Sequence, residues 1–218
     1  MSTVLHEPAS QVPTAVESTS PPACTPFGLS AEAFLRGVEQ DLFPSDRRIF
    51  LWDGRLYEKM AKKIAHSVAG EKVRRALARV LPPGWSLWGE NPILADEYTA
   101  PLPDLAVVRG ELDDYSDRKA VPKSAEIGLV VELAESSLRE DRTKTLSKYA
   151  TAGLPVYWLV NLVDRRVEAY SRPRSAEGVG SYDEQRVFLP DDQVPLILDG
   201  VEVARVPVAE ILPREDRA

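Results

Sequence analysis

The sequence contains a single cysteine, Cys24, among its 218 residues. One cysteine cannot form an intramolecular disulfide, and it excludes zinc and iron-sulfur sites that need several thiolates. The two histidines, His6 and His66, are too few for a three-histidine metal site. Long apolar runs are also missing, because the longest candidate, residues 154–163, is roughly half of what a bilayer requires. We therefore expect no membrane span.

Positive charge is in the minority, with 27 Lys and Arg residues against 34 Asp and Glu residues and a net charge of −7. A chain this acidic cannot be basic over its whole surface, so a nucleic-acid partner must be met by a local group of cations. The N-terminus has no basic stretch followed by an apolar core, and its first arginine is Arg36. We therefore expect a cytoplasmic protein.

Several enzyme motifs are missing as well. The chain has no G-x-x-x-x-G-K phosphate loop and no G-x-S-x-G nucleophile elbow. Gly178 and Gly180 lack the third glycine and the following helix of a dinucleotide site. These absences argue against a P-loop nucleotide hydrolase, a serine hydrolase of the elbow type and a dinucleotide-binding enzyme.

The composition that is present, 44% hydrophobic and 28% charged, is typical of a globular domain. Residues 1–28 differ from the rest because they are rich in proline and have no aromatic residue before Phe27, so we expect a disordered tail there. Cys24 and His6 lie in that tail and are most simply incidental. We expect one domain over residues 29–213 and a short tail at 214–218.

Apolar periodicity and turn residues predict a mixture of helices and strands. Asp53 and Gly54 predict the turn of a β-hairpin. Helical patterns begin at Ser30, at about Ser67, and at Ser136 or Ser137. The expected helices are a short one ending before residue 44, one over 67–81 and one reaching about 152. The expected strands are 49–52, 55–58, 85–88, a short one around residue 93, 104–109, 127–133, 156–161, 167–171, 185–189, 196–198 and 201–206.

Two carboxylates stand out on the central pair of strands. If strands 104–109 and 127–133 form an antiparallel pair in which Arg109 lies opposite Ile127, then Asp104 lies opposite Glu132. Opposed like charges destabilise a sheet unless a cation neutralises them. Glu132 also interrupts the apolar run 127–131, and a buried carboxylate needs a partner. The pair therefore predicts a site for an oxygen-preferring ion, Mg²⁺ or Mn²⁺.

The helix that follows Glu132 carries Lys144 and Lys148 on adjacent turns. Either ammonium could stabilise negative charge on a phosphate or activate a water. A solvated helix face is the alternative interpretation of each lysine.

The order of these motifs resembles the Uma-two family of restriction endonucleases, over about residues 30–213. The resemblance rests on the following segments: Asp53-Gly54, Tyr57-Glu58, His66, residues 90–93, 103–110 and 130–132, Asp141-Arg142, Tyr149 and residues 152–161.

The resemblance implies a PD-(D/E)xK nuclease fold, which is an α/β (α+β) arrangement with a mixed central sheet flanked by helices, here with extra β-hairpins. It implies metal-dependent hydrolysis of phosphodiester bonds in nucleic acid, most simply DNA, by a possible homodimer. Asp104 and Glu132 match the acidic metal ligands. Glu58 matches a family position that could add a third ligand. His66 matches one that could contact phosphate, although a capping or core histidine is the simpler interpretation of His66.

The lysine of the family motif is missing from both of its positions. Two residues after Glu132 stands Ala134, and the helix position four residues after Asp141 is Thr145. At about 100° per residue, Lys148 lies closer to the direction of Thr145 than Lys144 does, so we expect Lys148 to substitute for it. The alternative function is a catalytically impaired module with this fold that binds nucleic acid or a protein partner.

Overall fold

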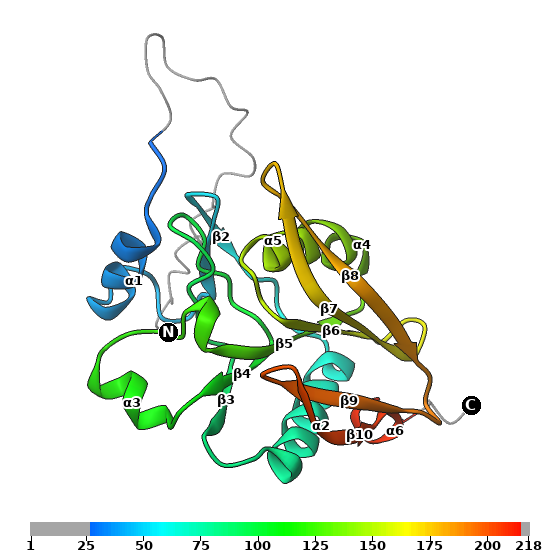
Figure 1. The fold of residues 1–218 in the computed structure, drawn as a ribbon. Helices are drawn as coiled ribbons and strands as arrows, with labels where there is room; N and C mark the ends of the chain where they lie inside the picture. The colour runs from blue at the N-terminus through cyan, green and yellow to red at the C-terminus, as the bar shows by residue number, and fades with distance from the viewer. Residues whose placement is uncertain (1–26, 215–218) are drawn as a thin grey trace, which may run out of the picture.

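The computed structural model describes residues 27–214, and a six-stranded sheet forms their centre (Figure 1). In spatial order its strands are β3 (Trp85–Gly89), β4 (Leu105–Arg109), β5 (Ile127–Ala134), β6 (Val156–Asn161), β7 (Arg166–Ala176) and β8 (Val179–Phe188). The pair β5 and β6 is parallel and its neighbours are antiparallel. The predicted mixed central sheet is therefore confirmed.

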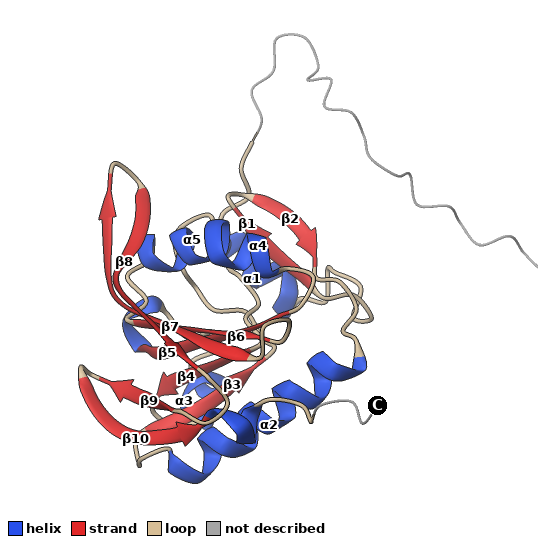
Figure 2. Cartoon of the chain, turned by 90° about the vertical axis from the view of Figure 1, so that its right-hand side faces the viewer, coloured by secondary structure: helices blue, strands red, loops and turns tan. Residues whose placement is uncertain are grey.

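Both faces of this sheet are covered (Figure 2). One face packs against α2 (Ile64–Val80), α6 (Val208–Ile211) and the hairpin of β9 (Gln193–Leu198) and β10 (Val201–Pro207). The other packs against α3 (Leu112–Asp117) and α5 (Leu146–Thr151). Residues of β5 alternate between the faces, with Leu129 and Val131 in the first core and Val130 in the second. Burial on both faces explains why this strand reads as a nearly continuous apolar run.

The hairpin of β1 (Ile49–Trp52) and β2 (Arg55–Glu58) forms as its turn residues predict. Asp53 and Gly54 both have positive φ, 47° and 73°, which is the backbone of a type I′ turn. Leu51 anchors the hairpin in a small third core with Phe34 of α1 (Ala31–Glu39).

The helix predicted after β5 is present but not continuous. It consists of α4 (Leu138–Glu140), the π-helical turn η2 (Asp141–Thr145) and α5. Thr143 donates a side-chain hydrogen bond to the Arg139 carbonyl at 2.7 Å, a contact that bends helices. The wider turn breaks the regular rotation of 100° per residue that we assumed across this segment.

Two further differences concern helices. Residues 110–126, predicted to be a loop, contain α3 and the short helix η1 (Ser124–Glu126). Buried Tyr115 anchors α3, and its hydroxyl donates to the Arg109 carbonyl at 2.6 Å. The helix predicted from about Ser67 begins three residues earlier, at Ile64; its N-cap Lys63 makes no side-chain capping bond, so the sequence offers no start signal at that point.

Most of the predicted tails, residues 1–26 and 215–218, lie outside the described residues, as do His6 and Cys24. Within 27–214, no helix combines the length and the apolar character needed to cross a membrane.

Candidate active site

The two predicted carboxylates meet where β4 begins and β5 ends. Leu105 of β4 lies opposite Val131 of β5, so the predicted register holds at this end of the pair. Asp104 therefore lies beside Glu132, and the Asp104 backbone NH lies 3.4 Å from Glu132 Oε2, to which it donates a long hydrogen bond. Both side chains are buried, with 3% and 9% of their surfaces exposed.

The register does not continue to the other end of the two strands. A bulge between Val107 and Val108 shifts the pairing by one residue, so that Val108 lies opposite Ile127. The predicted opposition of Arg109 and Ile127 is therefore wrong. The bulge lies away from the carboxylates and leaves their juxtaposition intact.

An ammonium group that the sequence did not point to lies between the carboxylates. Lys59 Nζ is 2.9 Å from Asp104 Oδ1 and 3.3 Å from Glu132 Oε2, and it also donates to the Leu102 carbonyl at 2.9 Å. Lys62 Nζ lies 3.1 Å from the same Asp104 oxygen. One cation thus bridges the two acidic side chains, at the position where our sequence argument expects a metal ion.

Asp104 is further held from α2 and from β5. His66 Nε2 lies 3.2 Å from Asp104 Oδ2, and the Leu133 backbone NH donates to that oxygen at 2.9 Å. Burial alone would raise the pKa of Asp104. The His66 imidazole and the ammonium groups of Lys59 and Lys62 instead hold this pKa well below its usual range.

Glu132 has the opposite tendency. Burial raises the pKa of Glu132 well above its usual range, Lys59 opposes this shift, and the charges of Asp104 and Asp141 add to it. The Tyr149 hydroxyl of α5 donates to Glu132 Oε1 at 2.6 Å. The two carboxylates therefore differ in environment, and Glu132 is the one whose charge depends on a neighbouring cation.

A cavity of about 150 Å³ opens over the carboxylates. Phe50 and Trp52 of β1 form one wall. Asp141 and Thr145 of the π-helical turn lie on another wall, and the Thr145 hydroxyl donates to Asp141 Oδ1 at 3.3 Å. Thr145, which stands where the resemblance leads us to expect lysine, therefore lines the cavity.

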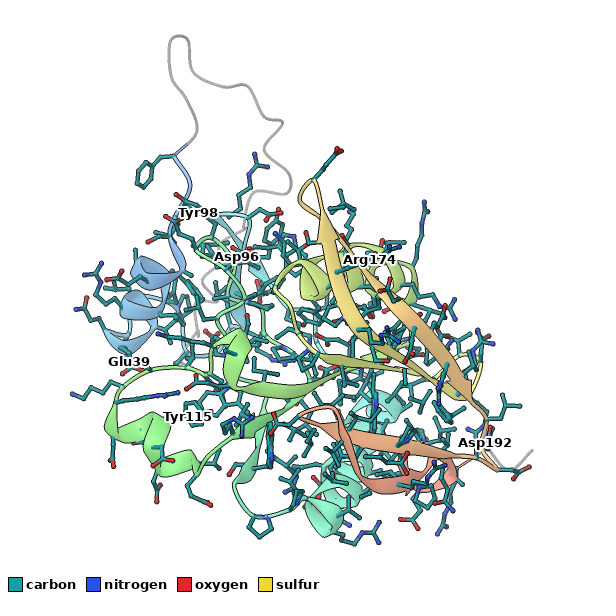
Figure 3. The ribbon with its side chains drawn as sticks, viewed as in Figure 1. Glu39, Asp96, Tyr98, Tyr115, Arg174 and Asp192 are labelled. Atoms are coloured by element: carbon teal, nitrogen blue, oxygen red, sulfur yellow. The ribbon has the colours of Figure 1, made fainter. Side chains whose placement is uncertain are left out.

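Lys148 lies beyond that cavity lining. Its Nζ donates to Asp53 Oδ1 in the hairpin turn and to Asp96 Oδ2 at 3.5 Å, and it lies 5.8 Å from the centre of the Trp52 ring. Figure 3 labels Asp96, in the loop beside the hairpin. The π-helical turn means that our angular argument for Lys148, which assumed a regular α-helix, does not describe this segment.

The remaining predicted site residues lie apart from the carboxylates. Lys144 is exposed on the π-helical turn. Glu58 is exposed, and its Oε2 lies 3.5 Å from Arg47. Since Glu58 directly precedes Lys59, their side chains leave the extended chain on opposite sides.

Lys59 and Lys62 are the site residues that sequence reasoning missed. They lie 45 and 42 positions before Asp104, in a segment with no helical or strand periodicity. A signal was nevertheless available. The type I′ turn at Asp53 and Gly54 fixes the hairpin register, and extending it places Lys59 opposite Arg48, on the face that also carries Phe50.

The donor atoms at this site suit a hard cation. Within residues 27–214 there is no cluster of three or more His, Cys, Asp or Glu side chains arranged to hold a metal. Asp104 and Glu132 offer two buried carboxylates that already share one cation, Lys59. Mg²⁺ in proteins is commonly held by one or two carboxylates, with waters and phosphate oxygens completing its shell, so the two residues fit such an ion.

Comparisons with known proteins identify the family and the fold of the chain. Residues 32–209 match the family model Uma2, described as "Putative restriction endonuclease". The chain belongs to this family. It is also similar in structure to a "putative nuclease belonging to DUF820" from Anabaena variabilis, with a TM-score of 0.61 and 15% identity over 84% of this chain and 97% of the other. At that identity the likeness shows the fold alone. A search of curated proteins finds no match.

Proposed function

We propose that this protein is a metal-dependent endonuclease that hydrolyses phosphodiester bonds of nucleic acid. The observation that carries the proposal is the convergence of Asp104 and Glu132, buried side by side where β4 begins and β5 ends, in a chain that belongs to a restriction endonuclease family. Metal use, the substrate and the roles of individual residues are part of the proposal.

Asp104 and Glu132 would hold Mg²⁺ or Mn²⁺. An ion bound there would polarise a phosphodiester and lower the pKa of a water molecule. The chain's own contribution is to orient its carboxylates. The Leu133 amide fixes one oxygen of Asp104, and the Tyr149 hydroxyl fixes one oxygen of Glu132.

In our proposal, Lys59 supplies the ammonium group that stabilises negative charge on the phosphate. Its Nζ already lies at the two carboxylates, and its flexible stem lets it shift toward a bound phosphate while remaining at the cavity. There it would offset negative charge that develops as the phosphate is attacked. Lys148, at the aromatic wall of the cavity, is the second candidate. Lys144 and Glu58 would need to move to take part.

The experiment is a cleavage assay on pooled DNA and RNA substrates with Mg²⁺ and with Mn²⁺. Wild type should cut only when a divalent ion is present, and Asp104→Asn should lose the activity while remaining folded. The matched control is Asp192→Asn, labelled in Figure 3. Asp192 does not line the cavity, and its carboxylate accepts a hydrogen bond from the Leu189 amide. Equal cleavage by wild type and Asp104→Asn would show that the site is elsewhere.

A second candidate function is a catalytically impaired module that binds nucleic acid or a protein partner. The observation in its favour is Thr145, which lines the cavity at the position where the resemblance implies lysine. The variant Thr145→Lys separates the two functions. If it cuts nucleic acid while wild type does not, the natural chain is the impaired form.

DNA as the substrate, a homodimer and a cytoplasmic location are further parts of the proposal, supported by membership of the restriction endonuclease family. The substrate pool decides between DNA and RNA. Sedimentation of the purified protein with and without DNA decides the oligomeric state.

A further inference from the structure

One face of the β1–β2 hairpin combines aromatic and cationic side chains. Directly opposed residues of an antiparallel pair project from the same face. Phe50 lies opposite Tyr57, and Trp52 lies opposite Arg55. The pairing extends one step further, because the Lys59 amide donates to the Arg48 carbonyl at 2.8 Å. We call these six residues the hairpin face: Arg48, Phe50, Trp52, Arg55, Tyr57 and Lys59.

The aromatic members are available for contact with a ligand. Phe50 and Tyr57 stack at 5.7 Å between ring centres, with their planes 27° apart. Tyr57 is 45% exposed, and Phe50 and Trp52 are partly buried where they line the cavity. The buried anchor of the hairpin, Leu51, projects from the opposite face. The hairpin is therefore anchored through its other face, and Tyr57 is the ring most exposed to a ligand.

The hairpin face leads into the site described above. Lys59, at one end of this face, contacts both Asp104 and Glu132. A chain of nucleotides lying along the hairpin face would thus pass from exposed Tyr57 to the carboxylates. The face carries three cations and no anion in a molecule whose net charge is −7. Arg55 is exposed, whereas Arg48 lies 3.2 Å from Glu90 and Lys59 is paired with the two carboxylates.

The chemistry of such a face favours unpaired bases. Aromatic side chains bind single-stranded nucleic acid by stacking on bases, while adjacent cations contact the phosphates. In a duplex the bases are already stacked on one another, so binding a base to an aromatic side chain costs the free energy of unstacking that base. The cavity over the carboxylates is also small. Its volume is about 150 Å³, and a cavity of that volume accommodates a ligand about the size of benzene.

We infer that the hairpin face is a binding platform for single-stranded nucleic acid, and that the site cuts a single strand or an unpaired segment. This inference rests on the proposed function for the cutting step alone. Binding to the platform needs neither a metal ion nor hydrolysis, so it is measured separately.

The test is fluorescence anisotropy with a labelled single strand, as DNA and as RNA, and with its duplex, at low salt in the presence of EDTA. The single strand should bind at least about 10-fold more tightly than the duplex. Tyr57→Ala should weaken single-strand binding by about 5- to 100-fold, which corresponds to the loss of one stacked base. Tyr57→Phe keeps the ring and should bind as wild type does.

The matched control is Leu56→Ala. Leu56 is the neighbour of Tyr57 on β2, is also 45% exposed and projects from the opposite face. It should leave single-strand binding unchanged. Equal loss in both variants would mean that the hairpin has merely been destabilised, and would overturn the inference.

Two other results would also overturn the inference. One is a duplex that binds as tightly as the single strand, which would point to groove or backbone recognition. The other is unchanged single-strand binding by Tyr57→Ala. Failure of the proposed function would give a different result. The single strand would still bind, Tyr57→Ala would still weaken that binding, and no divalent ion would support cleavage. A preference for the DNA or the RNA strand would tell which sugar the platform favours, and either preference supports the inference.

Discussion

At the scale of single residues, the site is defined by the difference between two neighbouring carboxylates. Asp104 is surrounded by the cationic side chains of Lys59 and Lys62 and by His66, which lower its pKa, whereas at Glu132 the effect of burial prevails and raises the pKa. A divalent ion would supply the charge that Glu132 lacks. The ion-binding role of the pair can therefore be tested without any knowledge of the substrate.

We expect Asp104→Asn and Glu132→Gln each to weaken Mn²⁺ binding strongly, because each removes one of two anionic ligands. Isothermal titration calorimetry measures the affinities. Asp141→Asn provides the comparison and should weaken Mn²⁺ binding less, since Asp141 lines the same cavity but stands outside the Lys59 ion pairs with Asp104 and Glu132. Equal Mn²⁺ affinity in wild type, Asp104→Asn and Glu132→Gln would contradict the assignment.

The lysines give a second prediction at this scale. If Lys59 supplies the ammonium, Lys59→Ala should lower metal-dependent cleavage by about 100- to 1,000-fold, as the loss of a charge-stabilising donor does. Lys144→Ala, at an exposed position, should leave the rate unchanged. Single-turnover cleavage of a saturating substrate measures the step. If Lys148→Ala greatly lowers the cleavage rate and Lys59→Ala changes it little, Lys148 and not Lys59 supplies the ammonium.

A third prediction concerns Glu168 of β7, which is buried away from the site with 1% of its side chain exposed. Burial opposes its ionisation, but hydrogen bonds from Arg142, Asn161, Tyr170 and Arg166 lower the pKa of Glu168 to about 2. The carboxylate thus stabilises the fold fully above its unfolded pKa near 4.5, and this contribution is lost as the pH falls toward 2.

Glu168→Gln should therefore lower the free energy of unfolding by about 3 kcal/mol at neutral pH, because it leaves buried donors without their anion. The difference from wild type should shrink as the pH falls below about 4.5. Thermal melts over a pH series measure it. Glu184→Gln, at an exposed ion pair with Arg172, is the control and should change little at any pH. A pH-independent difference for Glu168→Gln would show that packing, not charge, is responsible.

The residues of the site differ in how far the sequence reveals them. Glu132 could be recognised because it interrupts a buried apolar run, and Asp104 followed from an antiparallel register. For Lys59 the hairpin register predicts the face but not the contact, because its meeting with the carboxylates depends on how the hairpin packs against the sheet. Lysine is common on protein surfaces, so its presence in the sequence indicates no particular contact.

At the scale of elements, close packing of β8 against α5 holds the helix that reaches the site. A Cβ added at Gly180 would lie 2.2 Å from the Ser147 carbonyl oxygen and 2.3 Å from the Thr151 nitrogen. The same helix carries Tyr149, whose hydroxyl bonds to Glu132. Only glycine permits this approach.

We expect Gly180→Ala to destabilise the protein by about 3 kcal/mol and to weaken Mn²⁺ binding, because α5 must move away from the sheet. Denaturant melts and calorimetry measure the two effects. Gly178→Ala, in the turn of the same β7–β8 hairpin, is the control. Its φ of +79° gives a backbone cost of about 1–2 kcal/mol, but no atom lies within 4 Å of the added group, so Mn²⁺ binding should not change. Normal Mn²⁺ affinity in folded Gly180→Ala would uncouple this packing from the site.

Elements with strong local signals could be predicted, and those determined by tertiary contacts could not. The β1–β2 hairpin follows from Asp53 and Gly54, which suit a type I′ turn. The π-helical turn η2 has no such signal, since its residues fit a regular helix equally well. The helix α3 was missed because Tyr115 is the one buried residue among its six. A single buried position cannot produce the apolar periodicity by which a helix is recognised in a sequence.

At the scale of the whole molecule, an acidic protein must bind an acidic polymer through a few local cations. Three of them, Arg48, Arg55 and Lys59, belong to the hairpin face. Net charge repels the polymer at long range, and salt screens that repulsion as well as the local attraction. The salt dependence of binding therefore reports how many phosphates the platform contacts.

If the hairpin face contacts about three phosphates of a single strand, the logarithm of the binding constant should fall with the logarithm of salt concentration with a slope of about −2. Anisotropy titrations between low and moderate salt measure this slope. Arg55→Gln should reduce its magnitude by about 0.7, one phosphate contact, because Arg55 is exposed on the face. Arg174→Gln, an exposed arginine on the separate β7–β8 hairpin (Figure 3), should leave the slope unchanged. A slope that is the same in wild type and Arg55→Gln would mean that the strand does not cross the exposed end of this face, and its path to the carboxylates would then have to follow another surface.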